Sequence, residues 1–153
     1  MSRLALLALA LLLPALCPAA ETCQWLNAAT AGRILGGPST LDVTHPANRD
    51  DAVCTFKLQR GGAAELRIEV MTMETPRTEF TAHAEQCGAD SAPLTGIGNE
   101  AVVCSKPHAA RVVGRVRNRI FVVQFTAGDS PAAAAEMRDK AREVAETVAG
   151  NLF

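Results

Sequence analysis

The sequence predicts a single α+β domain in which an antiparallel sheet of about five to six strands is flanked by three helices. Runs of alternating apolar and polar residues occur in pairs joined by short turns, which is typical of β-hairpins. Segments of helical periodicity with capping residues stand before, between and after these runs. Helices that separate groups of hairpin-linked strands indicate an α+β fold.

The first 20 residues have the pattern of a removable signal peptide. Arg3 is followed by the unbroken apolar run Leu4–Leu13, and Pro14 ends this run before a stretch of small residues. We expect residues 1–20 to be removed and residues 21–153 to form one exported domain.

Cys17, near the end of this leader, raises the alternative of a lipoprotein. A lipoprotein signal has a small residue directly before the cysteine, and here that residue is Leu16. We therefore expect a protein without a lipid anchor at Cys17, located in the periplasm or secreted. No later apolar run has the length of a transmembrane helix.

The composition argues against one large class of function. The chain has 15 basic and 16 acidic residues and a formal net charge of −1, whereas nucleic-acid-binding proteins are usually basic overall. It has no tyrosine, and its one tryptophan is Trp25, so aromatic residues for base stacking are scarce. We expect no nucleic-acid partner, and we expect Trp25 to anchor the core.

Four cysteines remain after the leader: Cys23, Cys54, Cys87 and Cys104. An even number in an oxidising compartment predicts two disulfides, for which three connectivities exist. We favour Cys23–Cys54 and Cys87–Cys104, because each pair then joins the region of a helix to a strand through a loop of moderate length. The alternative of a zinc site lacks the required CxxC spacing.

Capping residues mark both ends of the first helix, and an alternating pattern marks the strands that follow it. Asn27 is an N-cap for a helix over Ala28–Leu35, and Gly36-Gly37-Pro38 ends that helix. Period-two alternation then predicts a short edge strand and a hairpin. The expected strands are Leu41–Thr44, Val53–Leu58 and Glu65–Met73.

Thr75 and Pro76 predict the start of a second helix, which continues to about Cys87. A loop over Gly88–Pro93 and a glycine-punctuated bend lead from it to the strand Ala101–Cys104.

The stretch Ala109–Ala127 is expected to organise the sheet. Its first half alternates, with small or apolar residues on one face and arginines on the other. Its second half, Ile120–Phe125, is apolar on both faces, as expected of a central strand that is covered on both sides. Asn118, between the halves, is the residue expected to adopt the positive φ of a tight turn.

The chain closes with a third helix. Ser130 as N-cap and Pro131 at the first position predict its start, and Gly150 predicts its end. Five residues share one face that we expect to pack on the sheet: Met137, Ala141, Val144, Ala145 and Val148.

Several short motifs carry a family resemblance. They are Cys23-x-Trp25-Leu26, Ile34–Pro38, Cys54 opening a strand, Leu94–Ala101, and the hairpin Arg115–Val123. Together they resemble small bacterial envelope domains, many of them lipoproteins, that are similar to the extracellular sensor domain of a mycobacterial Ser/Thr kinase. The resemblance implies a PsbP-like α/β/α sandwich in which the first two of the four cysteines are paired. It implies sensing or ligand binding and no particular catalytic chemistry.

One local charge asymmetry points to a binding surface. Between Ala101 and Gly128 there are five basic residues and no acidic ones. Three arginines are expected to share a strand face, with a fourth at the turn, and guanidinium groups suit carboxylates and phosphates. The alternative is that these arginines pair across the sheet with Glu65 and Glu69. The candidate ligand-binding residues are Arg111, Arg115, Arg117 and Arg119.

We expect no metal, no cofactor and no enzymatic activity. The sequence lacks a GxSxG elbow, a phosphate-binding loop and an HExxH motif. His45, His83 and His108 are widely separated, and the weighed alternative is a metal site of His45 with Asp50 or Asp51. We expect His83 to be partly buried with its hydrogen bonds satisfied.

These observations predict an exported, non-enzymatic binding or sensor-type module of the cell envelope. Its partner would be an anionic small molecule, an envelope component or a protein, bound by the arginine-bearing sheet face. The alternative is a structural or protein-interaction subunit of the envelope without a small ligand. A third hypothesis, a hydrolase, requires histidines and carboxylates that converge in a pocket with perturbed pKa values.

Overall fold

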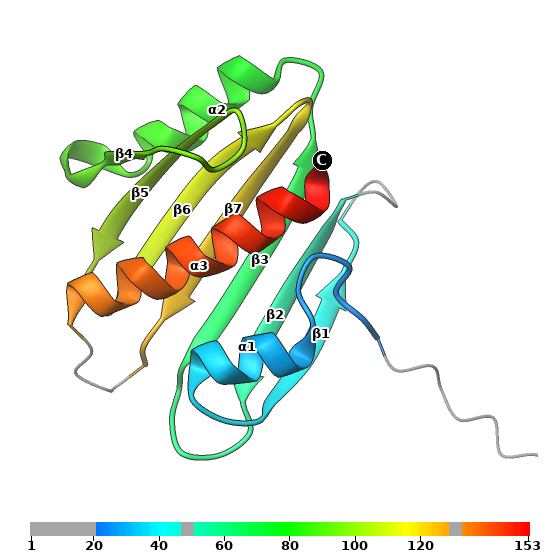
Figure 1. Ribbon diagram of the computed structural model, residues 1–153, viewed down its shortest axis with the longest axis vertical. Helices are drawn as coiled ribbons and strands as arrows, with labels where there is room; N and C mark the ends of the chain where they lie inside the picture. Colours follow the sequence, from blue (N-terminus) through cyan, green and yellow to red (C-terminus); the bar gives the residue numbers. More distant parts are fainter. Residues whose placement is uncertain (1–20, 47–50, 129–132) are drawn as a thin grey trace, which may run out of the picture.

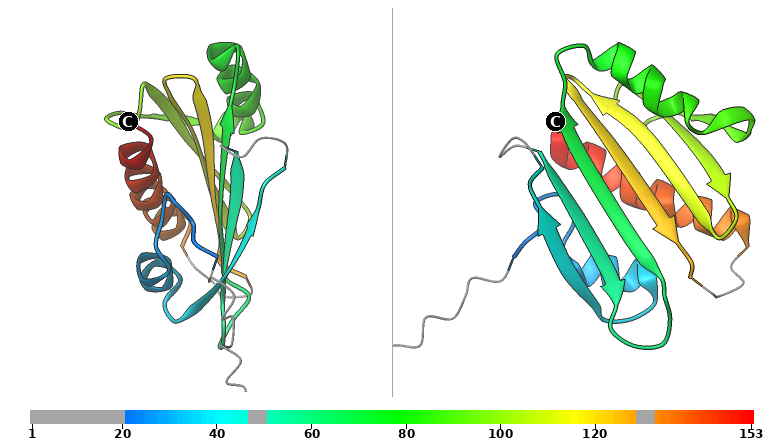
Figure 2. Two further views of the ribbon diagram at one scale, coloured as in Figure 1. Left: turned by 90° about the vertical axis from the view of Figure 1, so that its right-hand side faces the viewer. Right: turned by 180° about the vertical axis from the view of Figure 1, so that it is seen from behind.

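The computed structural model describes residues 21–46, 51–128 and 133–153. The predicted leader and the predicted helix start at Ser130 and Pro131 lie outside these ranges. The described residues form three layers, with a seven-stranded antiparallel sheet in the middle. Helices α1 (Ala28–Leu35) and α3 (Ala134–Leu152) cover one face, and α2 (Pro76–Glu85) lies on the other (Figures 1 and 2).

The strands lie in the order β1-β2-β3-β7-β6-β5-β4. The α+β class and the three helices are confirmed, but the sheet has one strand more than the predicted maximum. The missed strand is β4, a three-residue edge strand that contains Pro93 and follows a short 3-10 helix over Gly88–Asp90. Proline is tolerated in an edge strand. The segment over Gly88–Pro93 was expected to form a loop, and part of it forms this strand instead. The strands are β1 Ser39–Thr44, β2 Ala52–Leu58, β3 Glu65–Thr72, β4 Ala92–Leu94, β5 Glu100–Lys106, β6 Ala109–Val116 and β7 Arg119–Thr126.

Helix α1 has the predicted bounds and caps. The Asn27 side chain accepts a hydrogen bond of 2.8 Å from the Thr30 amide, which satisfies one of the free donors of the first turn. Gly36 ends the helix in the left-handed region at φ +89°, where glycine carries no steric penalty. Helix α2 starts at the predicted Pro76, but Thr75 makes no side-chain capping bond and the helix ends at Glu85.

Helix α3 buries the predicted face, but the prediction that Gly150 ends it is wrong. The helix continues to Leu152. Leu152 is buried, and the Asn151 amide donates a 2.9 Å hydrogen bond to the carbonyl of Trp25. These contacts outweigh the roughly 1 kcal/mol that glycine costs inside a helix.

Strand β7 is the central strand and separates two cores. Phe121, Val123 and Phe125 point into the larger core, under α1 and α3, together with the buried Trp25. Ile120 and Val122 point the other way, into a smaller core closed by Phe80 of α2. The predicted central strand, apolar on both faces, is therefore confirmed.

The turn between β6 and β7 differs from the prediction. Arg117, and not Asn118, takes the left-handed conformation, at φ +55°. Contacts from outside the turn explain the difference. The Arg117 amide donates to Oδ1 of Asn99 at 2.6 Å, and the Asn118 carbonyl accepts from the Met73 amide at 2.8 Å.

Both favoured disulfides are present. Cys23–Cys54 ties the segment before α1 to β2, and Cys87–Cys104 ties the end of α2 to β5, with Cα–Cα distances of 5.9 and 5.5 Å. In the described ranges, no helix combines the length and apolar character needed to cross a membrane.

Gly114 and Phe121 form a cross-strand pair that depends on the missing side chain. They are directly opposite each other in β6 and β7, and a Cβ at Gly114 would collide with the Phe121 ring. Both residues are buried in the larger core, so neither side of the pair has free space.

We expect Gly114→Val to lower the free energy of unfolding by about 1–3 kcal/mol, because it overpacks this pair. Combining it with Phe121→Leu should give a loss smaller than the sum of the two single losses, measured by denaturant unfolding. Gly150→Ala is the control, since a Cβ there meets nothing within 4 Å, and it should leave the protein equally or more stable. Strictly additive losses at Gly114 and Phe121 would contradict the steric account.

Candidate functional site

The four hairpin arginines do not converge on one site. Arg111 and Arg115 lie on the β6 face that looks toward α2, whereas Arg117 lies in the turn. Arg119 alternates with Ile120, which places it on the opposite face from α2. Arg111 and Arg115 are four residues apart, so their Cα atoms are separated by about 13 Å of strand. The two arginines therefore belong to different parts of the face, and each has its own side-chain partner, Gln86 for Arg111 and Glu100 for Arg115.

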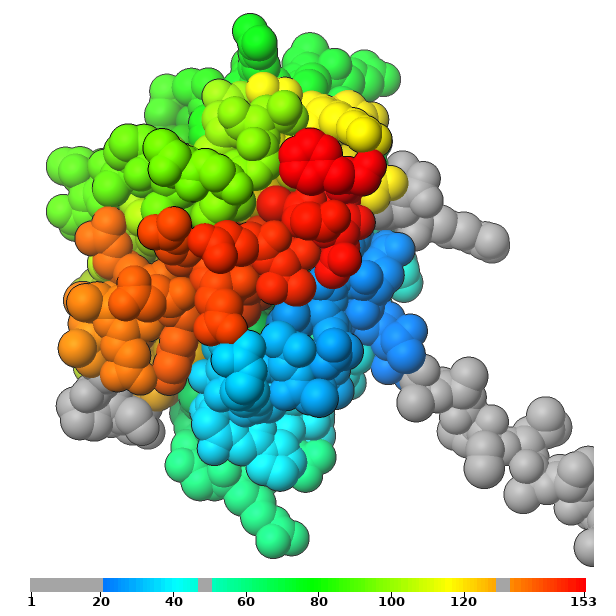
Figure 3. Space-filling view, in the orientation of Figure 1, coloured from blue at the N-terminus to red at the C-terminus, as the bar shows by residue number. Residues whose placement is uncertain are grey.

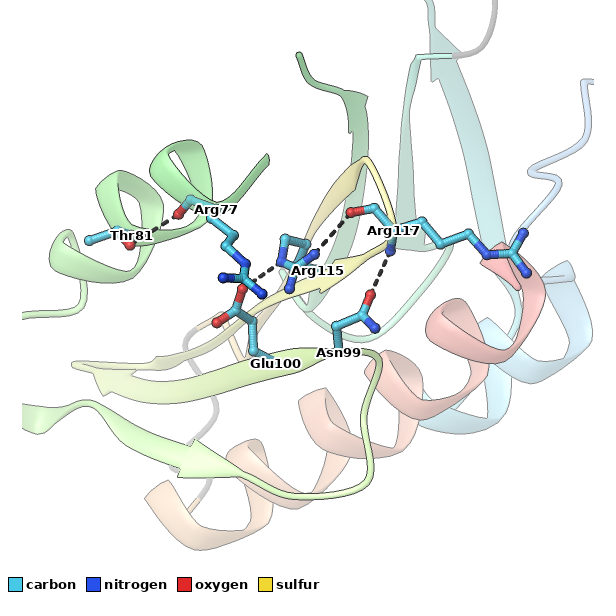
Figure 4. A network of polar contacts seen from close by, with 6 residues as sticks. All are labelled: Arg77, Thr81, Asn99, Glu100, Arg115 and Arg117. Carbon is cyan, nitrogen blue, oxygen red and sulfur yellow. Dashed lines mark hydrogen bonds and ion pairs between the residues drawn. The ribbon is translucent and has the colours of Figure 1, made fainter. Parts of the chain in front are cut away.

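Arg115 is held by its own sheet (Figure 4). Its Nε donates to Glu100, the directly opposite residue on β5, and its Nη1 donates to the carbonyl of Arg117 at 3.0 Å. The Arg115 side chain is only 13% exposed. In Figure 4, Arg77 extends from α2 toward the same Glu100 carboxylate. Arg115 therefore stabilises the turn and is poorly placed to bind a ligand.

Arg117 points toward the end of α3 (Figure 4). Its guanidinium carbon lies 5.9 Å from the centre of the Phe153 ring, a cation–π distance. The expectation that Arg117 shares a strand face with Arg111 and Arg115 is therefore wrong, because the left-handed backbone at Arg117 redirects its side chain.

Arg111 is the hairpin arginine with the most unusual surroundings. Its Nη1 donates a 3.0 Å hydrogen bond to the side-chain carbonyl of Gln86, and its Nε is buried without a hydrogen-bond partner in the described ranges. Burial lowers the pKa of the Arg111 guanidinium, and the nearby Glu69 carboxylate opposes that change. Arginine still remains protonated in proteins, so Arg111 is a partly desolvated positive charge with a neutral partner.

The cross-strand register extends this environment over the open half of the sheet. Arg67 on β3, Gln124 on β7 and Arg111 on β6 occupy one row, on the face that α2 covers only in part (Figure 2). Neighbouring strands are about 4.8 Å apart, so the Cα atoms of Arg67 and Arg111 are about 10 Å apart, with Gln124 on the strand between them. Gln124 is exposed. We call these three residues, together with Gln86, which contacts Arg111 from the end of α2, the Arg111 row.

Charge pairing accounts for part of this face. Glu69 forms an ion pair with Arg67 at 3.3 Å, and Glu65 forms one with Lys57 at 3.6 Å. The predicted cross-sheet partners Glu65 and Glu69 thus pair with β2 and β3 residues, and the Arg111 row keeps one excess positive charge.

The histidines do not assemble a metal site. His45 contacts the backbone carbonyl of Asp51 at 3.0 Å, while the Asp51 carboxylate accepts from the Thr72 amide at 2.8 Å. Asp50 lies outside the described residues. Within those residues, no group of three or more potential ligands is close enough to hold a metal ion. His83 is partly buried as expected, but its Nδ1 has no described hydrogen-bond partner, so the expectation of satisfied hydrogen bonds is wrong.

A pocket that the sequence did not predict lies on the opposite face of the sheet. It has a volume of about 500 Å³ and is formed where the end of α1, the β2–β3 loop and the first half of α3 meet. Glycines at 36, 61 and 62 were the available signal, but they were assigned only to turns. None of the hairpin arginines lines this pocket.

Comparison with known proteins gives no family. The chain matches no family model and no curated protein. Among solved structures, it is similar to a GTP-binding regulator from Thermotoga maritima, with a TM-score of 0.43 and 15% identity over 82% of this chain and 92% of that one. A likeness of this degree carries no argument about function.

The Arg115–Glu100 pair gives a direct test of the turn. Glu100→Ala leaves the nearly buried Arg115 without its carboxylate, and we expect a loss of about 1–2 kcal/mol in unfolding free energy, between the values for exposed and buried pairs. Glu146→Ala is the matched control, because it breaks the half-exposed pair with Arg142 on α3 and should cost less than about 0.5 kcal/mol. Equal losses in the two variants, measured by chemical denaturation, would show that the Arg115 pair has no special role.

Proposed function

We propose that this chain is an exported, non-enzymatic binding module of the cell envelope that holds an anionic ligand at the Arg111 row. The leader pattern supports export, and the two disulfides are compatible with an oxidising compartment. The resemblance to envelope sensor domains also favours binding over catalysis.

The observation that carries this proposal is the buried Nε of Arg111, which has no hydrogen-bond partner among the described residues. A buried donor without an acceptor is costly, and the cost is greater for a charged group. A carboxylate or phosphate at Arg111 would supply charge-assisted hydrogen bonds, which are roughly twice as strong as neutral ones. Gln86 and Gln124 flank Arg111 with amide groups that can donate to the same anion.

A non-enzymatic role agrees with the rest of the described site. The groups around Arg111 are amides, an arginine and a paired glutamate, and this set lacks a nucleophile next to a base. Histidines and carboxylates do not converge there within the described ranges.

The alternative, a protein-interaction subunit of the envelope, rests on the same open half of the sheet. Lys57, Glu65, Arg67 and Glu69 give β2 and β3 an alternating pattern of charges that a complementary protein surface would match. The two proposals differ in how Arg67 and Arg111 respond to small anions.

The test is a titration with inorganic phosphate at constant ionic strength, followed by ¹H–¹⁵N NMR. We expect saturable shifts of the Arg111 Nε–H and of the Gln86 and Gln124 side-chain amides. The shifts of the Gln86 and Gln124 amides should disappear in Arg111→Ala and persist in Arg142→Ala, which removes an exposed arginine on α3.

Shifts that persist in Arg111→Ala would refute the site. The absence of any saturable shift, in a protein that melts normally, would favour the protein-interaction alternative. Cross-linking to envelope proteins that is lost in Arg67→Glu would then be the supporting result.

A further inference from the structure

The Cys87–Cys104 disulfide lies next to the Arg111 row. Cys104 on β5 is the directly opposite partner of Arg111 on β6, so both side chains project from the sheet on the α2 side. The Cβ atoms of such a pair are about 5 Å apart. Cys87 immediately follows Gln86, whose side-chain carbonyl accepts the 3.0 Å hydrogen bond from Arg111. The disulfide therefore holds the end of α2 beside the Arg111 guanidinium.

Apart from this bond, α2 is weakly attached to the sheet. Phe80 is the only buried residue of this helix, all of which is described. On the opposite face, α3 buries seven residues. There α1 and α3 lie side by side (Figure 3), and Arg33 of α1 forms an ion pair with Glu143 of α3. Elements with few buried contacts open locally at low free energy, so the end of α2 depends on its tether more than the other helices do.

The chain around this tether is exposed. Gln86 and residues 88–91 are exposed, whereas Cys87 and Cys104 are buried. Pairing with the sheet resumes at Ala92 on β4. The buried disulfide is therefore the fixed point of an exposed segment, and Gln86 is the neighbour whose position depends on it.

Loss of the tether would change the surroundings of Arg111 in two ways. Gln86 would no longer be held beside the guanidinium, so a bound anion would lose a flanking amide group. Water would also reach the buried Nε of Arg111, and a solvated charge attracts an anion less strongly than a desolvated charge does. Both changes weaken the binding of an anion.

We propose that the Cys87–Cys104 disulfide controls anion binding at Arg111, so that the site is complete only after these two cysteines have been oxidised. In that step the two thiols lose two protons and two electrons and form one S–S bond. The oxidant is a disulfide, such as glutathione disulfide, which is reduced to two thiols. An exported chain meets such oxidants outside the cytosol, so export completes the site. This inference rests on the function proposed above and adds its regulation.

The test measures the dissociation constant for inorganic phosphate in two disulfide variants, by the NMR titration at constant ionic strength. Cys87→Ser/Cys104→Ser should raise this constant at least about tenfold, the effect of losing one hydrogen bond to a charged group. Cys23→Ser/Cys54→Ser is the matched control, because it removes the disulfide between the segment before α1 and β2, and it should bind phosphate as the parent does. Dithiothreitol added to this control, whose remaining disulfide is Cys87–Cys104, should produce the same rise. Reoxidation with glutathione disulfide should reverse it.

Two further measurements do not depend on the stability of a cysteine variant. Gln86→Ala keeps both disulfides and should also weaken phosphate binding, and full affinity in this variant overturns the route through Gln86. In the parent without phosphate, the Arg111 Nε–H should exchange with solvent slowly, and it should exchange faster when dithiothreitol reduces the protein, with denaturant melts checking that the fold persists.

The outcomes separate this inference from the function on which it rests. Absence of saturable phosphate binding in the oxidised parent refutes the proposed function itself. Binding in the parent and equal binding in folded Cys87→Ser/Cys104→Ser overturns the regulation and leaves the proposed function intact. Equal weakening in the two disulfide variants also overturns the regulation, because the effect would then be one of general stability.

Discussion

The burial of β7 on both faces is the constraint on which the rest of the structure depends. Eight residues of β7 pair with β3 on one side, and the same eight pair with β6 on the other. A one-residue slip of this strand would exchange Phe121 and Val122 between the two cores, so its register is fixed by packing as well as by hydrogen bonds. Phe121 restricts the pairing of β7 with β6 further, because its ring occupies the space that a side chain at Gly114 would need.

The alternation of β7 also sets the positions of both candidate sites. Gln124 points to the α2 face, where it lies between Arg67 and Arg111. Phe125, the next residue, points to the opposite face and forms part of the pocket wall beside Lys140. Two consecutive residues of the most constrained strand thus contribute to two surfaces with different chemistry. In each surface, a β7 residue is held in place by the core, and the charged groups come from the surrounding elements.

Much of the fold could be predicted because its signals are local. Asn27 and Gly36 mark the two ends of α1, and the two-sided apolar run at Ile120–Phe125 marks the central strand. Predictions failed where a distant contact overrides a local preference. Asn99 and Met73 fix the turn around Arg117, and the contact between Asn151 and Trp25 helps to carry α3 past Gly150.

The candidate sites were less accessible to sequence reasoning. Arg111 was among the predicted residues, but its difference from Arg115 depends on which neighbour each meets, Gln86 at the C-terminal cap of α2 or Glu100 on β5. The pocket is assembled from four separate segments of the chain, and none of them has a motif of its own. Glycines that the sequence explains as turns also create the space, and only the tertiary structure brings these turns together.

The central claim, that β7 is the most constrained element, is tested most directly by native-state hydrogen exchange. The amides of Phe121, Val122 and Val123 should exchange only through global unfolding, with a free energy equal to that from denaturant melts. Amides of the edge strands β1 and β4 should exchange with lower free energies. If the β7 amides exchange at lower free energies than those of β1 or α1, the sheet is not organised around β7.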